Sequence, residues 1–316
     1  MAGEVEACWC GGPVEKEIAT FSPGADGPFR LLSCSWCGTA ALVPQPSDAV
    51  LQRWYDVAYY GAGARKFVGP QARLVGWFQG GRARLAARLL PAGGRVLDVG
   101  CGDGGFLLQL RRPGLHVEGT ERTPESAARA QATAGVRVHA GDLLGLDLPD
   151  ASYDLVTLWH VFEHLARPEA TLRRIHHLLK PGGTLLLSLP NVESWQARLF
   201  ARHWFHHDPP RHLFAFGPRS LAALLEHSGF TVLRTSTFSL EQNPYGVMQS
   251  TLNALGFPRD RAYDGLKGIR RTPRSTRLLD LVLLAMLAAP GLAFALAETM
   301  AGRGGTMLVS ACTPRG

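Results

Sequence analysis

Four of the six cysteines lie within the first 37 residues of this 316-residue chain, and their spacing is that of a metal site. Two form a C-x-C pair and two form a C-x-x-C pair in the stretch CSWCG. Thiolates this close on a tight turn can face one Zn²⁺, and a second such turn on a returning hairpin completes a tetrahedron. The sequence therefore predicts a structural zinc knuckle with the ligands Cys8, Cys10, Cys34 and Cys37.

The alternative to this knuckle is a set of four buried or free thiols without a metal. The C-x-C pair is shorter than the usual C-x-x-C and strains its turn. A disulfide framework is not expected in a cytosolic chain. A catalytic zinc is disfavoured, because such a site keeps one coordination position open and we expect no histidine or carboxylate to share this one.

A second chemical signal is the stretch RVLDVGCGDGGFLLQL, residues 95–110, which is typical of a buried strand, a glycine turn and the start of a helix. Gly100, Gly102 and Gly104 let the backbone approach a ligand and leave amide groups pointing at it. The next strand, LHVEGTE, ends at Glu121, where a carboxylate can hold ribose hydroxyls. A nucleotide-like cofactor is predicted.

The elements that must position these residues alternate between strands and helices. Three more apolar strands with polar tips follow, in VRVHAGDL, SYDLVTLWHVFEHL and LLKPGGTLLLSLPN. Helical stretches such as PESAARAQATA and PEATLRRIHHLL separate them. This alternation predicts a parallel sheet with helices on both faces, which is an α/β fold.

The order of these motifs resembles that of class I S-adenosylmethionine-dependent methyltransferases. The resemblance covers about Arg95 to Phe230 and rests on D-x-G-C-G-D-G at Asp98, the acid Glu121, G-D-L at Asp142, E-H-L at Glu163 and K-P-G-G at Lys180. It implies a doubly wound, Rossmann-like sheet of seven strands that is mostly parallel, with the antiparallel seventh strand between the fifth and the sixth. It also implies S-adenosylmethionine as the cofactor.

The resemblance implies a role for each motif. Asp98 and the glycines would line the methionine side, Glu121 would bind the ribose, and Asp142 would meet the adenine edge. A nicotinamide-dependent oxidoreductase is disfavoured, since it does not explain the K-P-G-G turn or the E-H dipeptide. A methyltransferase-like domain without catalysis stays open. The full set of implied cofactor residues is Asp98, Gly100, Cys101, Gly102, Gly104, Glu121, Asp142, Leu143 and Trp159.

Methyl transfer to a hydroxyl requires alignment of donor and acceptor and a base that removes the acceptor proton. Histidine suits this task because its pKa lies near neutrality. By resemblance, LWHVFEHL lies beside the methyl group and PPRHLFAF crosses the mouth of the cleft. Glu163 and His164 could instead orient the helix that follows them. The predicted catalytic residues are His212, His164, Glu163 and His160.

The acceptor is predicted from the stretch PPRHLFAF, which resembles the P-R-H-L-x-x-F element of a bacterial methyltransferase branch with an N-terminal cysteine knuckle. Deoxysugar C-methyltransferases share the knuckle, but Arg211 stands here in place of their glutamate. We therefore expect O-methylation of a saccharide, a lipid-linked saccharide or a natural-product hydroxyl. An RNA methyltransferase is the alternative, although no basic run is interleaved with stacking aromatics.

The predicted sixth and seventh strands, Thr231 to Ser239 and Thr306 to Thr313, are separated by a long insertion. It contains RLLDLVLLAMLAAPGLAFALAE, which is long and apolar enough for a membrane span. Spanning is disfavoured, because the last strand must return to the sheet and Pro290 with Gly291 is expected to break the helix. Interfacial lipid contact through residues 267–300, packing against the core and a homodimer contact remain open.

The whole chain is predicted to comprise a knuckle, a capping segment, a core and the insertion. The capping helix, LQRWYDVAYYGAGARKF, is expected to be helical through Tyr60, with aromatic residues that pack the knuckle or touch substrate. These aromatics are Trp54, Tyr55, Tyr59 and Tyr60. The predicted boundaries are 1–46 for a zinc-ribbon-like knuckle, 47–90 for capping helices, 91–240 with 303–316 for the core, and 241–302 for the apolar helical insertion.

Composition supports a globular protein, with 46% hydrophobic and 19% charged residues. The net charge of +7 comes from scattered arginines, so nucleic acid is not expected as a partner. The stretch MAGEVEACWC has glutamates where a secretory signal would have lysines and an apolar core. We expect a cytoplasmic protein, membrane-associated if the insertion meets lipid, that acts on a small molecule or glycan.

Overall fold

The computed structural model describes residues 8–22, 26–54, 70–267 and 273–315. They form two units of the chain. Unit 1 combines the N-terminal segment with residues 190–221 and 236–307, and unit 2 combines residues 67–189 with 222–235 and 308–316. The predicted domain boundaries stay predictions, but residues 190–221, expected in the core segment, group with the N-terminal segment.

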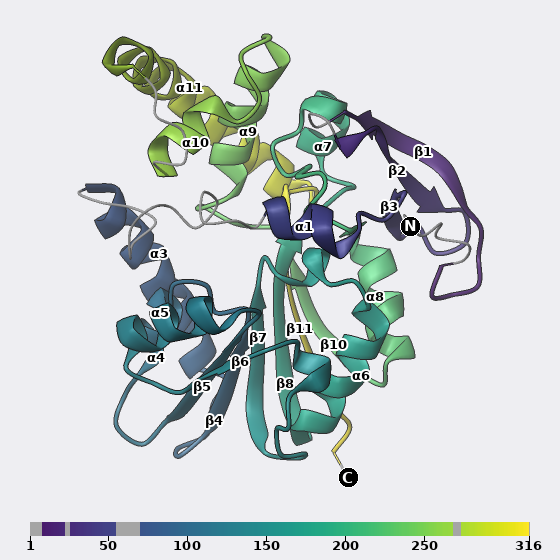
Figure 1. The fold of residues 1–316 in the computed structure, drawn as a ribbon, viewed down its shortest axis with the longest axis vertical. Coiled ribbons are helices and arrows are strands. Elements are labelled where there is room, and N and C mark those ends of the chain that lie inside the picture. Colours follow the sequence, from purple (N-terminus) through teal and green to yellow (C-terminus); the bar gives the residue numbers. More distant parts are fainter. Residues whose placement is uncertain (1–7, 23–25, 55–69, 268–272, 316) are drawn as a thin grey trace. The chain divides into compact units, whose positions relative to one another are not determined.

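A seven-stranded sheet is the framework of unit 2 (Figure 1). The strands β4, β5, β6, β7 and β8 pair in parallel. The end of β11 meets the start of β8, since the N–H of Thr313 donates to the carbonyl of Gly183 at 3.0 Å. These two strands therefore run in opposite directions. The order is β10 (Thr231–Ser236), β11 (Thr306–Cys312), β8 (Leu179–Pro190), β7 (Tyr153–Trp159), β4 (Arg95–Val99), β5 (His116–Glu121) and β6 (Val138–Ala140).

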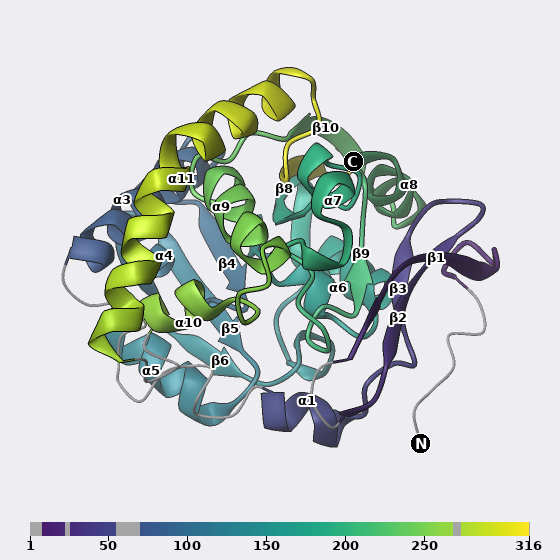
Figure 2. The same ribbon diagram turned by 90° about the horizontal axis from the view of Figure 1, so that it is seen from above.

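This order confirms the predicted doubly wound sheet, with the last strand inserted between the fifth and the sixth. Its central strands read as almost continuous apolar runs because both faces are covered, and Leu97, Val156 and Leu187 are completely buried. One face carries α3 (Pro70–Ala87), α4 (Gly105–Leu110) and α5 (Pro124–Ala134), and the other carries α6 (Pro168–Leu178) and α8 (Pro218–His227) (Figure 2).

Local signals in the sequence set the ends of these helices. At the start of α5, the hydroxyl of Thr123 accepts a hydrogen bond from the N–H of Ser126, and Pro124 occupies the first turn. At its end, Gly135 takes a left-handed conformation with φ of 64°. Between them, Ala127 and Ala130 are buried toward the sheet.

Unit 1 contains a four-stranded sheet in the order β1 (Val14–Phe21), β2 (Phe29–Cys34), β3 (Ala40–Val43) and β9 (Phe214–Ala215). Its core includes Phe29, Leu31 and Leu42, which are at most 3% exposed. The last strand comes from the segment after β8, and Ala215 pairs with Ala40 of the knuckle segment. This long-range pairing joins the P-R-H-L segment, residues 209–216, to the cysteine segment, residues 8–43.

The helices of unit 1 include α1 (Asp48–Trp54), α7 (Trp195–Phe200), α9 (Asn243–Ala254), α10 (Arg261–Lys267) and α11 (Arg274–Met300). In α1, the indole N–H of Trp54 donates to Asp26 at 2.7 Å, so this side chain is held within the unit. Tyr55, Tyr59 and Tyr60 lie outside the described residues.

The predicted break at Pro290 is wrong. Helix α11 continues from Arg274 to Met300 with Pro290 inside it, and its axis changes direction along its length (Figure 2). A proline within a helix removes one N–H and clashes with the preceding turn, which bends the helix without having to end it. The apolar stretch of the insertion therefore forms one continuous helix.

Two buried acids attach α11 to the rest of unit 1. Asp280 pairs with the guanidinium of Arg261, with Nε 3.0 Å from Oδ1. Near the other end, Glu298 accepts hydrogen bonds from Gln196 Nε2 at 2.5 Å and from the N–H of Gly305 at 3.1 Å. The oxygen of Gln196 in turn accepts from the indole of Trp204 at 2.9 Å.

Burial raises the pKa of Glu298 to about 7, although hydrogen bonds from Gln196 and Gly305 oppose this rise. The folded state therefore holds the proton more tightly than the unfolded state, whose pKa is 4.5. The stability from this group is fully present below the unfolded pKa and is lost as the pH rises through about 7.

We expect Glu298→Gln, which cannot ionise, to become more stable relative to the wild type by on the order of 2 kcal/mol as the pH rises from about 5 to about 8. Urea denaturation of both proteins at the two pH values measures this change. The prediction would be contradicted if the difference in unfolding free energy between Glu298→Gln and the wild type were the same at both pH values.

Candidate functional site

The candidate cofactor residues of unit 2 lie at one edge of its sheet. Gly100 follows β4, Glu121 ends β5 and His160 follows β7. These three strands run in parallel, so their carboxyl ends meet at the same edge. In open α/β sheets ligands bind outside this edge. The structure thus brings together the glycine turn, the acid of the second strand and the segment after the fourth strand.

The glycine turn needs its glycines for backbone reasons. Gly100, Gly102 and Gly104 have φ values of 69°, 64° and 78°, which side chains rarely tolerate. A Cβ on Gly100 would lie 2.7 Å from the side chain of Val161, and one on Gly104 would lie 2.5 Å from the carbonyl oxygen of Ala130. The turn is therefore a tight cradle in which only glycine fits.

Hydrogen bonds attach this turn to β5. The N–H groups of Gly100 and Cys101 both donate to the carbonyl of Thr120 at 3.0 Å. The N–H of Gly102 donates to Oε1 of Glu121 at 2.5 Å, and this carboxylate is 6% exposed. The acid is thus fixed against the backbone of the glycine turn, where it can also accept hydrogen bonds from a ligand.

Asp98 is buried at the end of β4, where the hydroxyl of Thr157 donates to it at 2.5 Å. Burial raises the pKa of Asp98 to about 7; the bond from Thr157 and the charge of Arg82 oppose the rise, while Glu121 adds to it. Sequence reasoning did not identify Thr157 or Arg82. The nearly continuous apolar run of the fourth strand could have indicated Thr157, since a polar residue inside a buried strand needs a partner.

The other predicted cofactor residues surround the same edge of unit 2. Asp142 accepts from the N–H of Leu144 at 3.0 Å and begins the short turn Leu143–Gly145, in which Leu143 is buried. The ring of Trp159 lies 5.4 Å from that of Phe106, and the guanidinium of Arg82 lies 5.0 Å above it. This cation–π contact fixes the indole at the end of β7.

Cys101 has a packing role in the turn. It is 7% exposed, and a Cβ on Gly119 would lie 2.8 Å from its sulfur. Burial raises the pKa of the Cys101 thiol, as do the nearby charges of Asp98 and Glu121. A thiol that stays protonated is a poor nucleophile, so this cysteine contributes shape and not reactivity.

The segment after β7 places His160 and Glu163 close to each other. Nδ1 of His160 lies 3.5 Å from Oε1 of Glu163, whose side chain is buried. His160 has φ of 55°, and its N–H donates to the carbonyl of Ser188 at 2.7 Å. Strained residues of this kind gather at functional sites. His164 completes the short helix Phe162–His164.

His212 belongs to unit 1, in the turn that precedes β9. Its Nδ1 lies 2.9 Å from the carbonyl oxygen of His206, so Nδ1 carries the proton of a neutral ring. The lone pair is then on Nε2, the atom that a general base would use. The adjacent Arg211 forms two hydrogen bonds with Asp208, at 2.9 and 2.6 Å, which sequence reasoning did not foresee.

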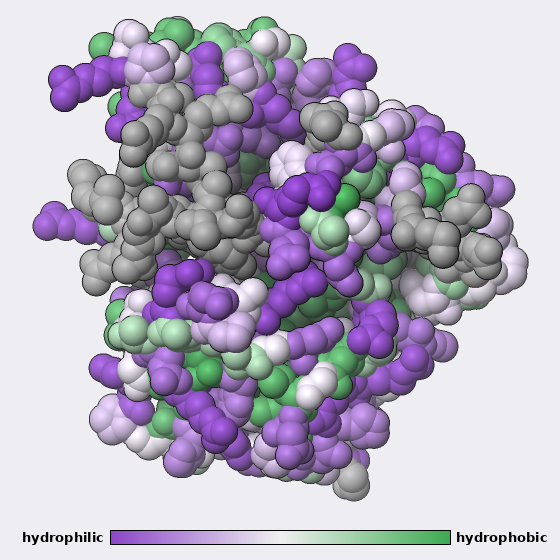
Figure 3. Space-filling model, in the orientation of Figure 1, coloured by the Kyte–Doolittle hydropathy of each residue, from purple (hydrophilic) through white to green (hydrophobic). Residues whose placement is uncertain are grey.

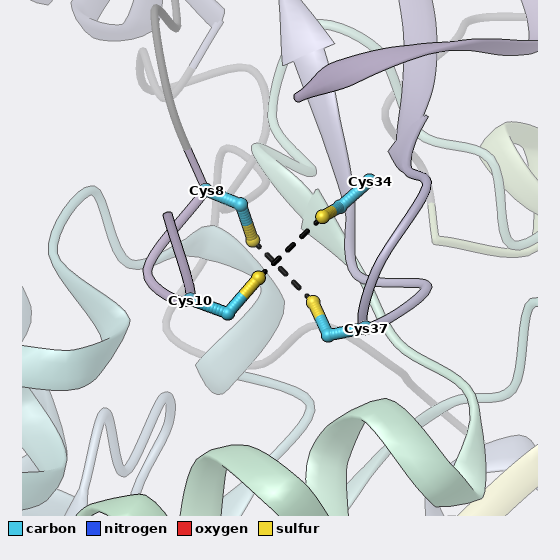
Figure 4. A group of neighbouring side chains, drawn as sticks. All are labelled: Cys8, Cys10, Cys34 and Cys37. Atoms are coloured by element: carbon cyan, nitrogen blue, oxygen red, sulfur yellow. Dashed lines mark hydrogen bonds between the residues drawn. The ribbon is translucent and has the colours of Figure 1, made fainter. Parts of the chain in front are cut away.

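The four N-terminal cysteines converge (Figure 4). The sulfurs of Cys8 and Cys37 lie 3.5 Å apart, as do those of Cys10 and Cys34, and all four lie within 4.8 Å of one another. A disulfide requires about 2 Å between sulfurs, whereas Zn–S bonds of about 2.3 Å in a tetrahedron put the sulfurs about 3.8 Å apart. The cluster has the size of a metal site.

The surroundings of Cys34 favour a thiolate. Burial raises its pKa, but backbone N–H groups of Cys37 and Trp36 and the neighbouring thiols outweigh this effect and bring the pKa to about 7. Gly12 lies against this sulfur, and a Cβ there would be 2.7 Å from it. The donor set of four sulfurs fits Zn²⁺.

Comparison with known proteins gives matches over the middle of the chain. A family model described as a methyltransferase domain matches residues 77–235. A ubiquinone biosynthesis O-methyltransferase of Xanthomonas axonopodis pv. citri is 36% identical over 150 residues, which are 45% of this chain and 58% of that protein. A demethylmenaquinone methyltransferase of Deinococcus radiodurans is 36% identical over 138 residues, 41% of this chain and 57% of that protein. The chain spans less than two thirds of the length of these relatives.

Solved structures share the fold. A methyltransferase dependent on S-adenosylmethionine from Archaeoglobus fulgidus has a TM-score of 0.50 at 20% identity and covers 75% of this chain and 94% of its own. A methyltransferase of Haloferax volcanii, solved with the activator Trm112, has a TM-score of 0.50 at 20% identity and covers 82% of this chain and 98% of its own.

Proposed function

The chain belongs to the methyltransferase-domain family of enzymes that use S-adenosylmethionine, and we propose that it methylates a hydroxyl group of an apolar, quinone-like small molecule. The observation that carries the acceptor class is the 36% identity to a ubiquinone biosynthesis O-methyltransferase. The saccharide expected from the sequence has no counterpart in the names of the relatives described above, which refer to quinones. We propose a cytoplasmic placement, as expected from the sequence.

The residues at the carboxyl edge of the unit 2 sheet fit the cofactor. S-adenosylmethionine supplies an electrophilic methyl group on a sulfonium. The narrow turn from Gly100 to Gly104 would let its backbone approach, and Glu121, already fixed by Gly102, would accept hydrogen bonds from the ribose hydroxyls. We propose that the cofactor is held by Asp98, Gly100, Cys101, Gly102, Gly104, Glu121, Asp142, Leu143 and Trp159.

We expect Glu121→Gln to weaken S-adenosylmethionine binding about tenfold or more, because the amide keeps an acceptor for the N–H of Gly102 but lacks the charge that strengthens a bond to a hydroxyl. Isothermal titration calorimetry measures the Kd. Glu125→Gln, an exposed site in the first turn of α5, is the matched control and should bind as the wild type does. If the wild type did not bind S-adenosylmethionine, the enzyme assignment would fail in favour of a methyltransferase-like binding module.

For the base we propose Nε2 of His212, which would take the proton of the acceptor hydroxyl as the methyl group is transferred. Its tautomer supports this role, since the bond to the carbonyl of His206 leaves the lone pair on Nε2. We propose that His164, Glu163 and His160 line the acceptor side of the cofactor. The contact of 3.5 Å between His160 and Glu163 would orient that imidazole.

We expect His212→Asn to lower kcat roughly 100-fold or more and to leave the cofactor Kd unchanged, because a base adds to the rate of chemistry and not to the binding of the methyl donor. Release of S-adenosylhomocysteine in the presence of a cellular lipid extract is the measurement. His227→Asn, an exposed histidine of α8, is the control. A His212→Asn enzyme with wild-type turnover would exclude the assignment.

We further propose that the four N-terminal cysteines bind one structural Zn²⁺. The cluster supplies four sulfurs and no carboxylate or imidazole among them, which is the ligand set of a closed structural site. Such an ion would hold the turn of Cys8 and Cys10 against the turn of Cys34 and Cys37 (Figure 4).

Loss of one thiolate should abolish this site. We expect Cys37→Ser to purify with less than about a tenth of the zinc of the wild type, and to melt at a lower temperature, since metal binding is coupled to the folding of the knuckle. Elemental analysis by mass spectrometry gives the metal content. Cys312→Ser, at the end of β11, should retain it. Wild-type protein purified without zinc, and unable to take it up, would favour four free thiols.

A further inference from the structure

From Leu278 to Met300, helix α11 buries its charged side chains and exposes apolar ones, the reverse of a helix that faces water. Its only charged residues from Leu278 to Met300 are Asp280 and Glu298, which are 5% and 0% exposed. By contrast, the side chains that face outward from this stretch are apolar. They include Leu278, Leu281, Val282, Met286, Leu292 and Leu296, each between 39% and 70% exposed.

Helical geometry explains this sorting. Asp280 and Glu298 are 18 residues apart, which at 3.6 residues per turn is five turns, so both project from the same side of the helix. Gly291 and Ala295 share this side and are buried. A Cβ on Gly291 would lie 3.0 Å from the side chain of Met248 in α9. The polar side of α11 therefore packs on unit 1, and none of the described residues of unit 1 covers its apolar side.

The uncovered surface extends beyond the helix. An apolar cavity of about 210 Å³ lies beside α11 and is lined by Leu199, Phe200, Val247, Met248, Leu287 and Phe294 among others. Leu199 of α7 is itself 63% exposed. Part of this surface is visible along the upper edge of Figure 3, where Figure 1 places α11. A contiguous apolar surface of this kind indicates a binding partner.

We propose that this face of unit 1 docks on the surface of an anionic lipid bilayer, with α11 lying in the interface. Charge and aromatic residues at its borders support lipid as the occupant. Arg274 and Arg277, in the first turn of α11, are exposed beside Leu278 and would meet anionic headgroups. Trp195 is 41% exposed, with its ring 6.4 Å from that of Phe294, and a tryptophan at such a border suits the headgroup region.

The helix lies in the interface and does not cross the bilayer. By length and composition alone it qualifies as a membrane span. However, its buried acids fix it along its length to α7, α10 and the loop before β11, through Gln196, Arg261 and Gly305. Withdrawal into hydrocarbon would leave both carboxylates without these partners, which is strongly unfavourable for a buried carboxylate. If its apolar side lies in lipid and its other side stays on the protein, both carboxylates keep their hydrogen-bond partners.

Vesicle flotation of the full chain tests the docking surface. We expect the protein to float with vesicles of phosphatidylglycerol and phosphatidylcholine, and the partition coefficient to fall roughly tenfold or more for Met286→Glu, which places a charge on the outward side of α11. Arg274→Gln combined with Arg277→Gln should lower flotation with these vesicles by a similar factor and leave flotation with pure phosphatidylcholine unchanged. High salt should weaken the arginine contribution only.

Leu74→Glu, a substitution at an exposed leucine of α3 in unit 2, is the matched control and should float as the wild type does. Circular dichroism melting and cofactor titration check that each variant folds. If Met286→Glu does not fold, the milder Leu281→Ser replaces it in the flotation experiment. The proposal is overturned if the wild type fails to float and instead forms a dimer that Met286→Glu dissociates. Resistance of the bound protein to carbonate extraction would also overturn it, in favour of a span. Flotation needs neither cofactor nor acceptor, so its result is independent of methyl transfer.

Discussion

The candidate site depends on one set of hydrogen bonds, those that hold the glycine turn against the end of β5. The carbonyl of Thr120 accepts from two consecutive N–H groups, and the carboxylate of Glu121 accepts from a third at 2.5 Å. Without these bonds the turn would be free to move away from the acid. Because they are made within the protein, the shape that a nucleotide-like cofactor requires exists before the cofactor binds, and little ordering remains to oppose binding.

Much of the architecture could be predicted from the sequence because its signals are local. Apolar strands ending in polar tips, separated by helical stretches, predict a parallel sheet. The family resemblance implies the strand order, and the sheet has that order. The glycine turn and Glu121 are predicted for the same reason, since the turn directly follows β4 and Glu121 ends β5. The convergence of the four cysteines is also expected from their spacing, and the binding of a zinc ion there is a proposal.

The features that escaped prediction depend on contacts between distant parts of the chain. Ala215 pairs with Ala40 across most of the sequence, and no local pattern indicates that the P-R-H-L segment completes the sheet of the cysteine segment. Helix α11 was expected to break at Pro290, but it is supported along one side by Arg261 and Gln196, whose partners cannot be read from spacing. Packing of this kind outweighs the local preference of a single proline.

The two proposals on function and membrane docking have a common chemical basis. An apolar, quinone-like acceptor would partition into a bilayer, and a face of unit 1 with uncovered leucines and flanking arginines suits an enzyme that meets such a molecule at a membrane surface. The most direct test of the central claim is methyl transfer itself. Purified protein, S-adenosylmethionine with a trideuterated methyl group and a cellular lipid extract should yield, by mass spectrometry, a lipid-soluble product that carries the label on oxygen. Label found only on water-soluble glycans or on RNA, or on no product at all, would contradict the account.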